Sequence, residues 1–262
     1  MIQSPVRALG PVSLRPIEPT RLDGFLSAPM ENDHSSSPPD SGSRRRRYRI
    51  RFAKTVAMRF TSHLDLQRTW ERTLRRAGLS PLYSQGFTPR PRLHLGAALP
   101  LGYTSEEDLA EVWLQEERAP ADTLSLLQRA APPGLRVLDV VSVPAEEPPI
   151  QQQIVAAIYE VHLEAPADLG GLRASAQKLM AEPSLPRSRR GKDYDLRPLL
   201  LSLEADLDSS RAPFLRMRLA AREGATGRPE EVLLALDLDP HLARITRTRL
   251  ILASEPPLED AL

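Results

Sequence analysis

The residues with the clearest chemical potential are arginines that lie among aromatic side chains in a loop rich in proline. The segment "YSQGFTPRPR" contains Tyr83, Phe87, Arg90 and Arg92. Guanidinium groups bind phosphates, and aromatic rings stack on unpaired bases. These residue types therefore predict a contact with RNA or with another ligand. The alternative is that the two rings plug the core beneath an exposed loop.

A helix is expected just before this loop, and it adds further arginines. Ser62 and Asp65 have the spacing of a capping box, and Gly78 supplies a helix end. The apolar residues recur four positions apart and form one buried stripe of Leu66, Trp70 and Leu74. The predicted binding residues of the helix and the loop are Arg68, Arg72, Arg75, Arg76, Tyr83, Gln85, Phe87, Arg90 and Arg92. Arg75 and Arg76 also complement the helix dipole, which is a structural alternative for these two.

Positive charge is concentrated in one part of an almost neutral chain. The 262 residues carry a formal net charge of +1, yet residues 44–94 contain 14 lysines and arginines and two acidic residues. Such a local field attracts a polyanion even when the total charge is small. The arginine run at 44–47 has two interpretations: a solubilising cluster at a domain edge, or an electrostatic tether to nucleic acid.

A second basic segment, "RSRRGKDYDLRP", lies in the later part of the chain. Its predicted binding residues are Arg189, Arg190, Lys192 and Arg197. Asp195 can serve acid–base chemistry here, with Arg197 as an anion clamp. The alternative is that Asp195 and Arg197 form structural ion pairs at the start of a strand.

Catalytic signatures are weak in this sequence. It lacks a glycine-rich phosphate loop, a serine nucleophile elbow and histidines at metal-ligand spacing, and no metal site is predicted. The weak catalytic candidates are His63, Asp65 and Asp195, since a histidine at a helix start can move a proton or contact a phosphate. The absence of cysteine excludes thiolate zinc sites and any iron–sulfur cluster ligated by this chain's own thiolates.

The elements that must position these residues predict an α+β fold. Apolar and basic residues alternate from Tyr48 to Phe52, as in a strand with one buried face. Short extended pieces are expected at 58–60 and 93–95, and a strand at 108–115 is buried on both faces or lies beneath a helix. A further helix and the strand "LRVLDVVSV" complete the order strand, helix, strand, strand, helix, strand. This is the order of a ferredoxin-like domain.

The same order recurs later in the chain, where 199–203 is ambiguous between helix and strand. We therefore predict two tandem ferredoxin-like (βαββαβ) halves. The predicted parts are a disordered Pro/Ser-rich arm at 1–46, a first half at 47–147, a second half at 154–253 and a tail at 254–262. No apolar run approaches the roughly 20 residues of a membrane span, and a secretory signal is not recognised, so we expect a cytoplasmic protein with no membrane partner.

Several of these segments resemble one known family. They are "RIRFAKT", "RFTSHLDLQRTWERTLRRAGLSPLYSQGFTPRPRL", "ALPLGYTSEEDLAEVWL" and "KDYDLRPLL". Together they are similar to the radical-SAM-associated family called domain of unknown function 2344, over residues 48–251. Members of this family are fused to, or encoded beside, radical SAM enzymes that often carry a cobalamin-binding module. The resemblance therefore implies a partner rather than a reaction.

Three hypotheses of function follow. The leading one is a non-catalytic accessory protein that presents an RNA, such as tRNA or rRNA, to a separate radical SAM enzyme. The iron–sulfur cluster and S-adenosylmethionine then belong to that partner, and this chain has no cofactor of its own. The second hypothesis is that the basic face docks on an acidic flank of the partner enzyme without nucleic acid. The third is an RNA-processing enzyme that uses His63, Asp65 or Asp195.

Overall fold

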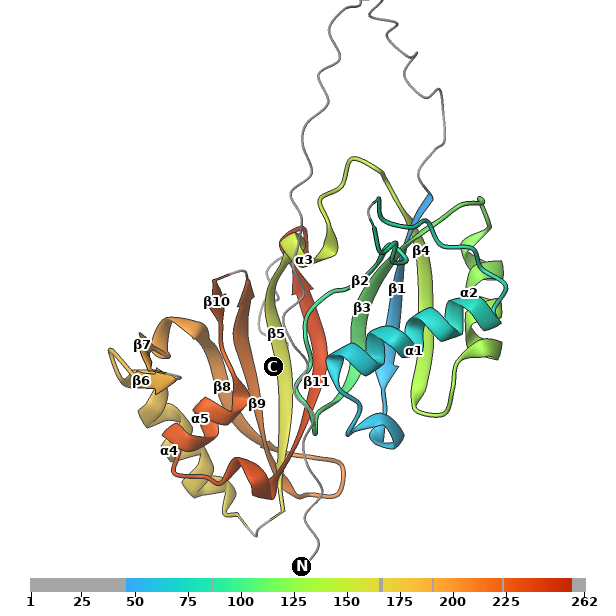
Figure 1. Ribbon diagram of the computed structural model, residues 1–262. Helices are drawn as coiled ribbons and strands as arrows, with labels where there is room; N and C mark the ends of the chain where they lie inside the picture. Colours follow the sequence, from blue (N-terminus) through green and yellow to red (C-terminus); the bar gives the residue numbers. More distant parts are fainter. Residues whose placement is uncertain (1–45, 86, 165–166, 190, 223, 256–262) are drawn as a thin grey trace, which may run out of the picture. The chain divides into compact units, whose positions relative to one another are not determined.

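The computed structural model describes residues 46–255, except residues 86, 165–166, 190 and 223 (Figure 1). The arm predicted at 1–46 thus lies outside the described residues apart from Arg46, which begins the first strand. The predicted tail is described only at Ser254 and Glu255. The described chain combines a few helices with one large, mostly antiparallel sheet, which confirms the α+β class.

The first half of the sheet is built from the blue and green strands of Figure 1. Its elements are β1 (Arg46–Lys54), α1 (His63–Arg76), β2 (Leu93–Leu95), β3 (Thr104–Leu114), α2 (Pro120–Ala130) and β4 (Leu135–Val143). β1 pairs with β4 and with β3, and β3 also pairs with β2, all antiparallel. The strand order is therefore β4-β1-β3-β2.

The second half of the sheet follows a short helix, α3 (Ile150–Gln153). Its elements are β5 (Ile154–Leu163), α4 (Leu169–Ala181), β6 (Pro186–Arg189), β7 (Lys192–Asp195), β8 (Leu200–Leu207), β9 (Pro213–Arg222), β10 (Ala225–Thr226), α5 (Pro229–Ala235) and β11 (Ala243–Leu252). β5 pairs with β11 and β9, and β9 also pairs with β8 and with the short β10. Apart from β10, the strand order is β11-β5-β9-β8, while β6 and β7 form a separate hairpin.

The two halves are joined edge to edge by β3 and β11. These strands are parallel where Thr104 lies opposite Thr246 and Ser105 opposite Arg247. The hydroxyl groups of Thr104 and Thr246 are hydrogen-bonded at 2.8 Å. One continuous sheet therefore runs through both halves.

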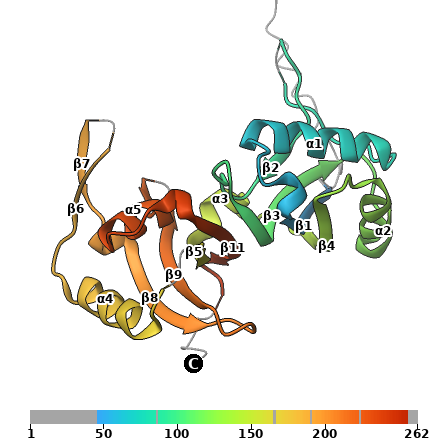
Figure 2. The same cartoon turned by 90° about the horizontal axis from the view of Figure 1, so that it is seen from below.

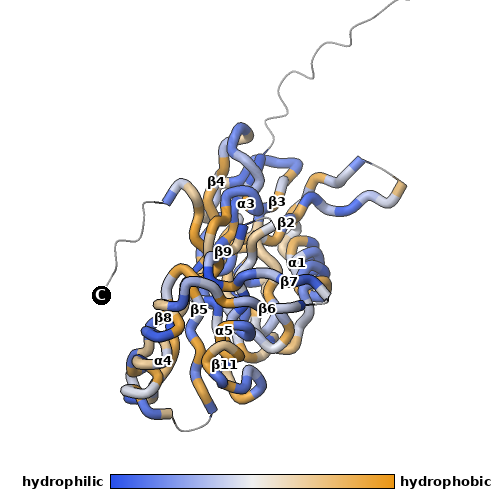
Figure 3. The backbone as a smooth tube through the Cα atoms, turned by 90° about the vertical axis from the view of Figure 1, so that its left-hand side faces the viewer, coloured by the Kyte–Doolittle hydropathy of each residue, from blue (hydrophilic) through white to orange (hydrophobic). Residues whose placement is uncertain are grey.

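Helices cover one face of this sheet and bury the core there. Tyr48, Ile50 and Phe52 of β1 are buried beneath α1, as their alternation predicts. The predicted apolar stripe of α1 is also buried, and the rings of Phe52 and Trp70 meet edge to face with centroids 5.1 Å apart. Figure 3 shows α1 as mostly hydrophilic along its length, in agreement with a helix that buries a single stripe.

Two local predictions differ from the structure, and one ambiguous stretch is resolved by it. Residues 58–60 are not extended, because Val56–Met58 forms a 3-10 turn that brings Met58 into the core against Gly134. β3 begins at Thr104, four residues before the predicted strand. The ambiguous stretch at 199–203 is a strand from Leu200 onward, preceded by the 3-10 turn Arg197–Leu199.

Within the described ranges, none of the helices has the length and apolar character that a membrane crossing requires.

Candidate functional site

The arginines of α1 lie at the surface, and three of them share a hollow. Arg72, Arg75 and Arg76 line a cavity of about 540 Å³ between α1 and the prolines that precede β4. Arg68 is exposed and is paired with Asp65 at 3.2 Å, one helical turn earlier. The structure thus brings together three of the four predicted helix arginines, while the fourth is paired within the helix.

The loop at 81–92 is a hairpin that extends away from the sheet (Figure 2, teal). Its two arms are joined by hydrogen bonds from Ser84 N to Arg90 O at 2.8 Å and from Arg92 N to Leu82 O at 2.7 Å. Tyr83 is half exposed, and Phe87 near the tip is fully exposed. The alternative that these two rings plug the core is therefore wrong. Gln85 and Arg90 are exposed as well, so the hairpin presents two rings, an amide and one arginine at its surface.

Arg92 differs from Arg90 because it is held at the base of the hairpin. Its guanidinium lies 4.7 Å from the ring centre of Trp113, and Arg47 lies 5.1 Å from the same ring. The ring of His94 meets Trp113 at 4.9 Å. Arg92 therefore anchors the hairpin to the sheet, and Arg90 is the arginine that remains at the surface.

The second basic segment forms the β6–β7 hairpin. Arg189 and Lys192 line a cavity of about 570 Å³, together with Tyr194 and Arg228. Arg190, a predicted binding residue, lies outside the described residues. Figure 2 shows that this hairpin and the hairpin at 81–92 extend toward the same side of the sheet. The structure therefore places the two predicted basic loops on one side of the sheet, one in each half.

Asp195 and Arg197 have structural contacts of their own. The carboxylate of Asp195 accepts hydrogen bonds from Leu185 N at 2.7 Å and Arg197 N at 2.9 Å, and these bonds lower the pKa of Asp195. Arg197 donates to three carbonyl oxygens, those of Met180, Glu182 and Leu200. The structural alternative thus accounts for both side chains, although through backbone contacts rather than through ion pairs.

His63 and Asp65 stand at the start of α1 but do not contact each other in the hydrogen bonds and ion pairs of the described residues. Asp65 serves the helix cap, because Ser62 Oγ accepts from Asp65 N and donates to its carboxylate. Burial lowers the pKa of His63, the charge of Arg247 lowers it further, and Asp108 opposes the shift. The weak catalytic candidates are therefore not assembled into one site, since Asp195 lies in the other half.

A buried network at the junction of the halves was missed by the sequence analysis. Arg247 of β11 donates to Asp108 of β3 at 2.7 and 2.9 Å and to the carbonyl oxygens of Ala97 and Ala98. Lys54 is buried beside it and donates to Tyr103 O at 3.1 Å. Burial lowers the pKa of Lys54, which the carboxylate of Asp108 opposes. The sequence signal for this network is weak, because a charged residue in a strand of alternating pattern is expected to face solvent.

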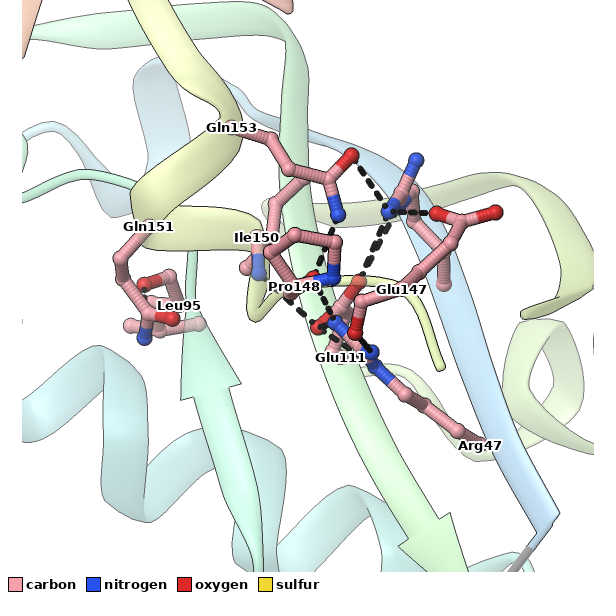
Figure 4. Close-up of polar contacts among 9 residues, drawn as sticks. Arg47, Leu95, Glu111, Glu147, Pro148, Ile150, Gln151 and Gln153 are labelled. Atoms are coloured by element: carbon pink, nitrogen blue, oxygen red, sulfur yellow. Dashed lines mark hydrogen bonds and ion pairs between the residues drawn. The ribbon is translucent and has the colours of Figure 1, made fainter. Parts of the chain in front are cut away.

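A second buried network involves the arginine run at 44–47. Arg47 and Glu111 form a buried ion pair, and Glu111 also accepts from Ile150 N at 3.1 Å (Figure 4). Arg47 donates to the carbonyl oxygens of Glu147 and Pro148 at 2.7 Å each. Arg46 is also paired, with Glu117 at 3.4 Å, so the two arginines of the run that the structure describes both have acidic partners, while residues 44 and 45 lie outside the described residues.

The sheet face opposite the helices carries mixed charges. A cavity of about 940 Å³ there is lined by residues of both halves, among them Glu106, Glu160, Arg136 and Arg216. Burial raises the pKa of Glu106, and Glu160 adds to the shift. Among the described residues, no group of three or more histidine, aspartate or glutamate side chains is arranged to hold a metal ion. Opposite charges in similar numbers make this face a poorer match for a polyanion than the two basic hairpins.

The fold and these surfaces define an α+β protein with two basic hairpins on one side of a continuous sheet. Residues 47–229 match the family described as "Uncharacterized protein conserved in bacteria (DUF2344)", and the chain belongs to this family. No curated protein matches the chain. Among solved structures it is similar to one titled "Crystal structure of putative glycine cleavage system transcriptional repressor", with 12% identity, a TM-score of 0.22, and coverage of 79% of this chain and 98% of that chain.

Proposed function

We propose that the chain is a non-catalytic accessory protein that binds single-stranded RNA on its basic hairpins and presents it to a separate radical SAM enzyme. The observation that carries this proposal is the hairpin at 81–92, where the fully exposed ring of Phe87 lies near the exposed Arg90. Such a ring contributes little to the core and is available to stack on a base, while the arginine is available to a phosphate. Single-stranded RNA uses both kinds of contact.

The proposal of a radical SAM partner is based on the resemblance of the sequence motifs to the family described above. The iron–sulfur cluster and S-adenosylmethionine would be held by that enzyme, because this sequence contains no cysteine to bind a cluster. The expected compartment is the cytoplasm. In this proposal the chain supplies binding and orientation of the RNA, and the partner supplies the chemistry.

We further propose that each half is a ferredoxin-like unit. The strand orders β4-β1-β3-β2 and β11-β5-β9-β8 support this, as does the position of a helix after the first and third strands of each half. In this assignment the β6–β7 hairpin is an insertion between α4 and β8. With the proposed boundaries, 47–147 and 154–253, the hydrogen bond from Arg47 to Glu147 O joins the first and last residues of the first unit.

The RNA contact is tested by the salt dependence of binding to a single-stranded oligoribonucleotide. Arg90→Ala should weaken binding and flatten the plot of log affinity against log salt by about 0.7, as for one lost phosphate contact. Phe87→Ala should weaken binding with the slope unchanged, because stacking releases no counterions. Arg129→Ala, an exposed arginine on α2, is the matched control. Equal affinities for the three variants and the unmodified protein would contradict the RNA contact.

The partner is tested by purifying the chain from its own cells, with and without ribonuclease. Recovery of a radical SAM enzyme that is lost after ribonuclease treatment supports presentation of RNA. Recovery that resists ribonuclease but is lost in the Arg90→Ala variant favours direct docking on the basic face. Turnover of RNA by the isolated chain would contradict the non-catalytic assignment.

A further inference from the structure

Three large apolar side chains are exposed close together at the start of α1. Phe60 is 75% exposed, Leu64 is 67% exposed and Leu101 is 62% exposed. Phe60 belongs to the turn that leads into α1, and Leu64 is the second residue of the helix. Figure 1 shows this turn in light blue, beyond the end of β1 and next to α1. Single exposed apolar residues are ordinary, but a group of them marks an interaction site.

Leu101 is held beside Phe60 through the backbone. Gly102 N donates to Arg59 O at 3.1 Å, and Arg59 Nε donates to Gly102 O at 2.8 Å. The guanidinium of Arg59 also lies 5.4 Å from the centre of the Phe60 ring. Two segments that are distant in sequence therefore meet here, and Phe60, Leu64 and Leu101 are named the apolar patch.

The apolar patch continues into a stripe of arginines along α1. Arg68 and Arg72 follow Leu64 at intervals of four residues. Arg75 comes three residues after Arg72, so all four side chains share one exposed face of the helix. Arg72 and Arg75 have no ion-pair partner among the described residues, whereas Arg68 is paired with Asp65. A partner of this face would meet apolar side chains at one end and cations along the rest.

The charge around the apolar patch selects the kind of partner. Residues 54–76 contain six lysines and arginines and two acidic residues. A second copy of the chain would bring this positive region against itself, because a symmetric dimer contact uses the same surface on both subunits. The aliphatic side chains of Leu64 and Leu101 offer RNA neither a ring to stack on nor a hydrogen bond. The complementary partner is therefore an acidic protein surface with an apolar pocket.

An anionic membrane would match the arginines and the apolar patch, but it would not match Asp65. The carboxylate of Asp65 is exposed next to Leu64 and would face headgroups of its own charge. A protein surface can instead offer this carboxylate a hydrogen-bond donor. This difference favours a protein over a membrane.

We infer that the apolar patch and the arginine stripe of α1 form a docking surface for an acidic protein that has an apolar pocket. The inference rests on the proposed function, in which this protein is the separate enzyme. α1 then binds the enzyme and the two hairpins bind RNA, so the two partners do not compete for one surface.

The test purifies the full chain with its bound enzyme from its own cells after ribonuclease treatment. The double variant Phe60→Ser/Leu64→Ser should lose the enzyme, and its affinity for the separately purified enzyme should fall about a hundredfold. Leu242→Ser removes a half-exposed leucine of the second half and is the matched control. Both variants should keep the melting temperature and the oligoribonucleotide affinity of the unmodified chain, because the substituted side chains are exposed and lie outside the hairpins.

The arginine stripe is tested by the rate of association with the purified enzyme. Arg72→Ala should slow association severalfold at low salt, and the difference should disappear at high salt. Arg129→Ala, on the exposed side of α2, should leave the rate unchanged. Equal rates for the two variants would contradict the acidic character assigned to the partner.

The outcomes separate this inference from the proposed function. An enzyme that the double variant retains after ribonuclease treatment would overturn the inference and leave the proposed function standing. An enzyme that the unmodified chain loses after ribonuclease treatment would do the same, because RNA alone would then join the two proteins. Failure to recover any radical SAM enzyme, with or without ribonuclease, would contradict both.

Two further measurements on the purified chain exclude other occupants of the apolar patch. A dimer in sedimentation velocity that dissociates in the double variant would overturn the inference in favour of a second copy. Binding to vesicles of phosphatidylglycerol and phosphatidylcholine that the double variant lacks would overturn it in favour of a membrane.

Discussion

The ion pair between Arg247 and Asp108 is a buried side-chain contact between the two halves. Both side chains are buried, and the distances are 2.7 and 2.9 Å. Removal of one charge leaves the other buried and uncompensated, which costs about 3–5 kcal/mol. We expect Asp108→Asn to lower the free energy of unfolding in urea by about this amount.

Asp139 provides the matched control for this substitution. It is also a strand aspartate paired with an arginine, Arg51, at 3.0 Å, but this pair is partly exposed. Asp139→Asn should therefore cost about 0–1 kcal/mol. Similar costs for the two variants would mean that the junction pair contributes no more than a surface pair.

His63 should make the stability depend on pH. Its pKa is lowered from 6.5 in the folded chain, first by burial and then by the charge of Arg247. The unfolded chain therefore binds the proton more tightly, so this part of the stability is complete above pH 6.5 and is lost as the pH falls through that value. We expect His63→Gln to reduce the loss of stability between pH 7 and pH 5.5, roughly the range in which an unshifted histidine titrates.

His94 contributes with the same sign, because burial also lowers its pKa, so His63→Gln alone leaves part of the pH dependence. The exposed His241 is the control position for the same urea titrations. If His63→Gln retains the full pH dependence of the unmodified protein, the burial of His63 has no energetic effect.

At the scale of elements, the N-terminus of α1 depends on one side chain. Ser62 Oγ accepts a hydrogen bond from Asp65 N at 3.2 Å and donates to the Asp65 carboxylate at 2.7 Å. Ser62→Ala should lower the free energy of unfolding by about 1 kcal/mol. Ser125→Ala in α2 is the comparison, because that hydroxyl bonds back to Ala121 O within the helix and its loss should be near neutral. Equal effects would indicate that the cap is not needed for α1.

Helices and strands were predictable from the sequence where the cap, the spacing of apolar residues or the alternation lies within the segment itself. α1 was marked by its cap, its stripe and Gly78, which has a φ of 66°. β4 matched its predicted segment, and the alternation of β1 identified its buried face. Residues 58–60 were not predictable in this way, because their turn depends on Gly134, which lies far along the chain and contacts Met58.

The candidate site was predictable only in part, for a related physical reason. Residue type and spacing indicated two basic loops, but exposure is set by the tertiary fold, and so the sequence did not separate Arg90 from Arg92. The cavity on the sheet face opposite the helices is likewise lined by residues of both halves that are distant in sequence.

At the scale of the whole molecule, the two halves should unfold together. They share one sheet through β3 and β11, and a buried ion pair crosses this junction. Both tryptophans of the chain, Trp70 and Trp113, lie in the first half, so their fluorescence reports on that half alone. Circular dichroism reports on both halves. We expect the two urea transitions to coincide.

Asp108→Asn shows whether the junction causes this coupling. In that variant the fluorescence and circular dichroism curves should move apart if the ion pair transmits stability between the halves. Separate transitions in the unmodified protein would mean that the halves are independent folding units despite their common sheet.

The segment that connects the halves is fastened to the sheet rather than free. Glu147 and Pro148 bond to Arg47, and Ile150 bonds to Glu111 (Figure 4). A flexible linker between the halves would let the two basic hairpins bind RNA strands of many different lengths. A fixed connection instead keeps the two basic hairpins at one constant distance from each other. If the hairpins bind RNA as proposed, an RNA strand too short to reach both would gain no affinity from the second hairpin, and one that just spans them would gain its whole contribution in one step.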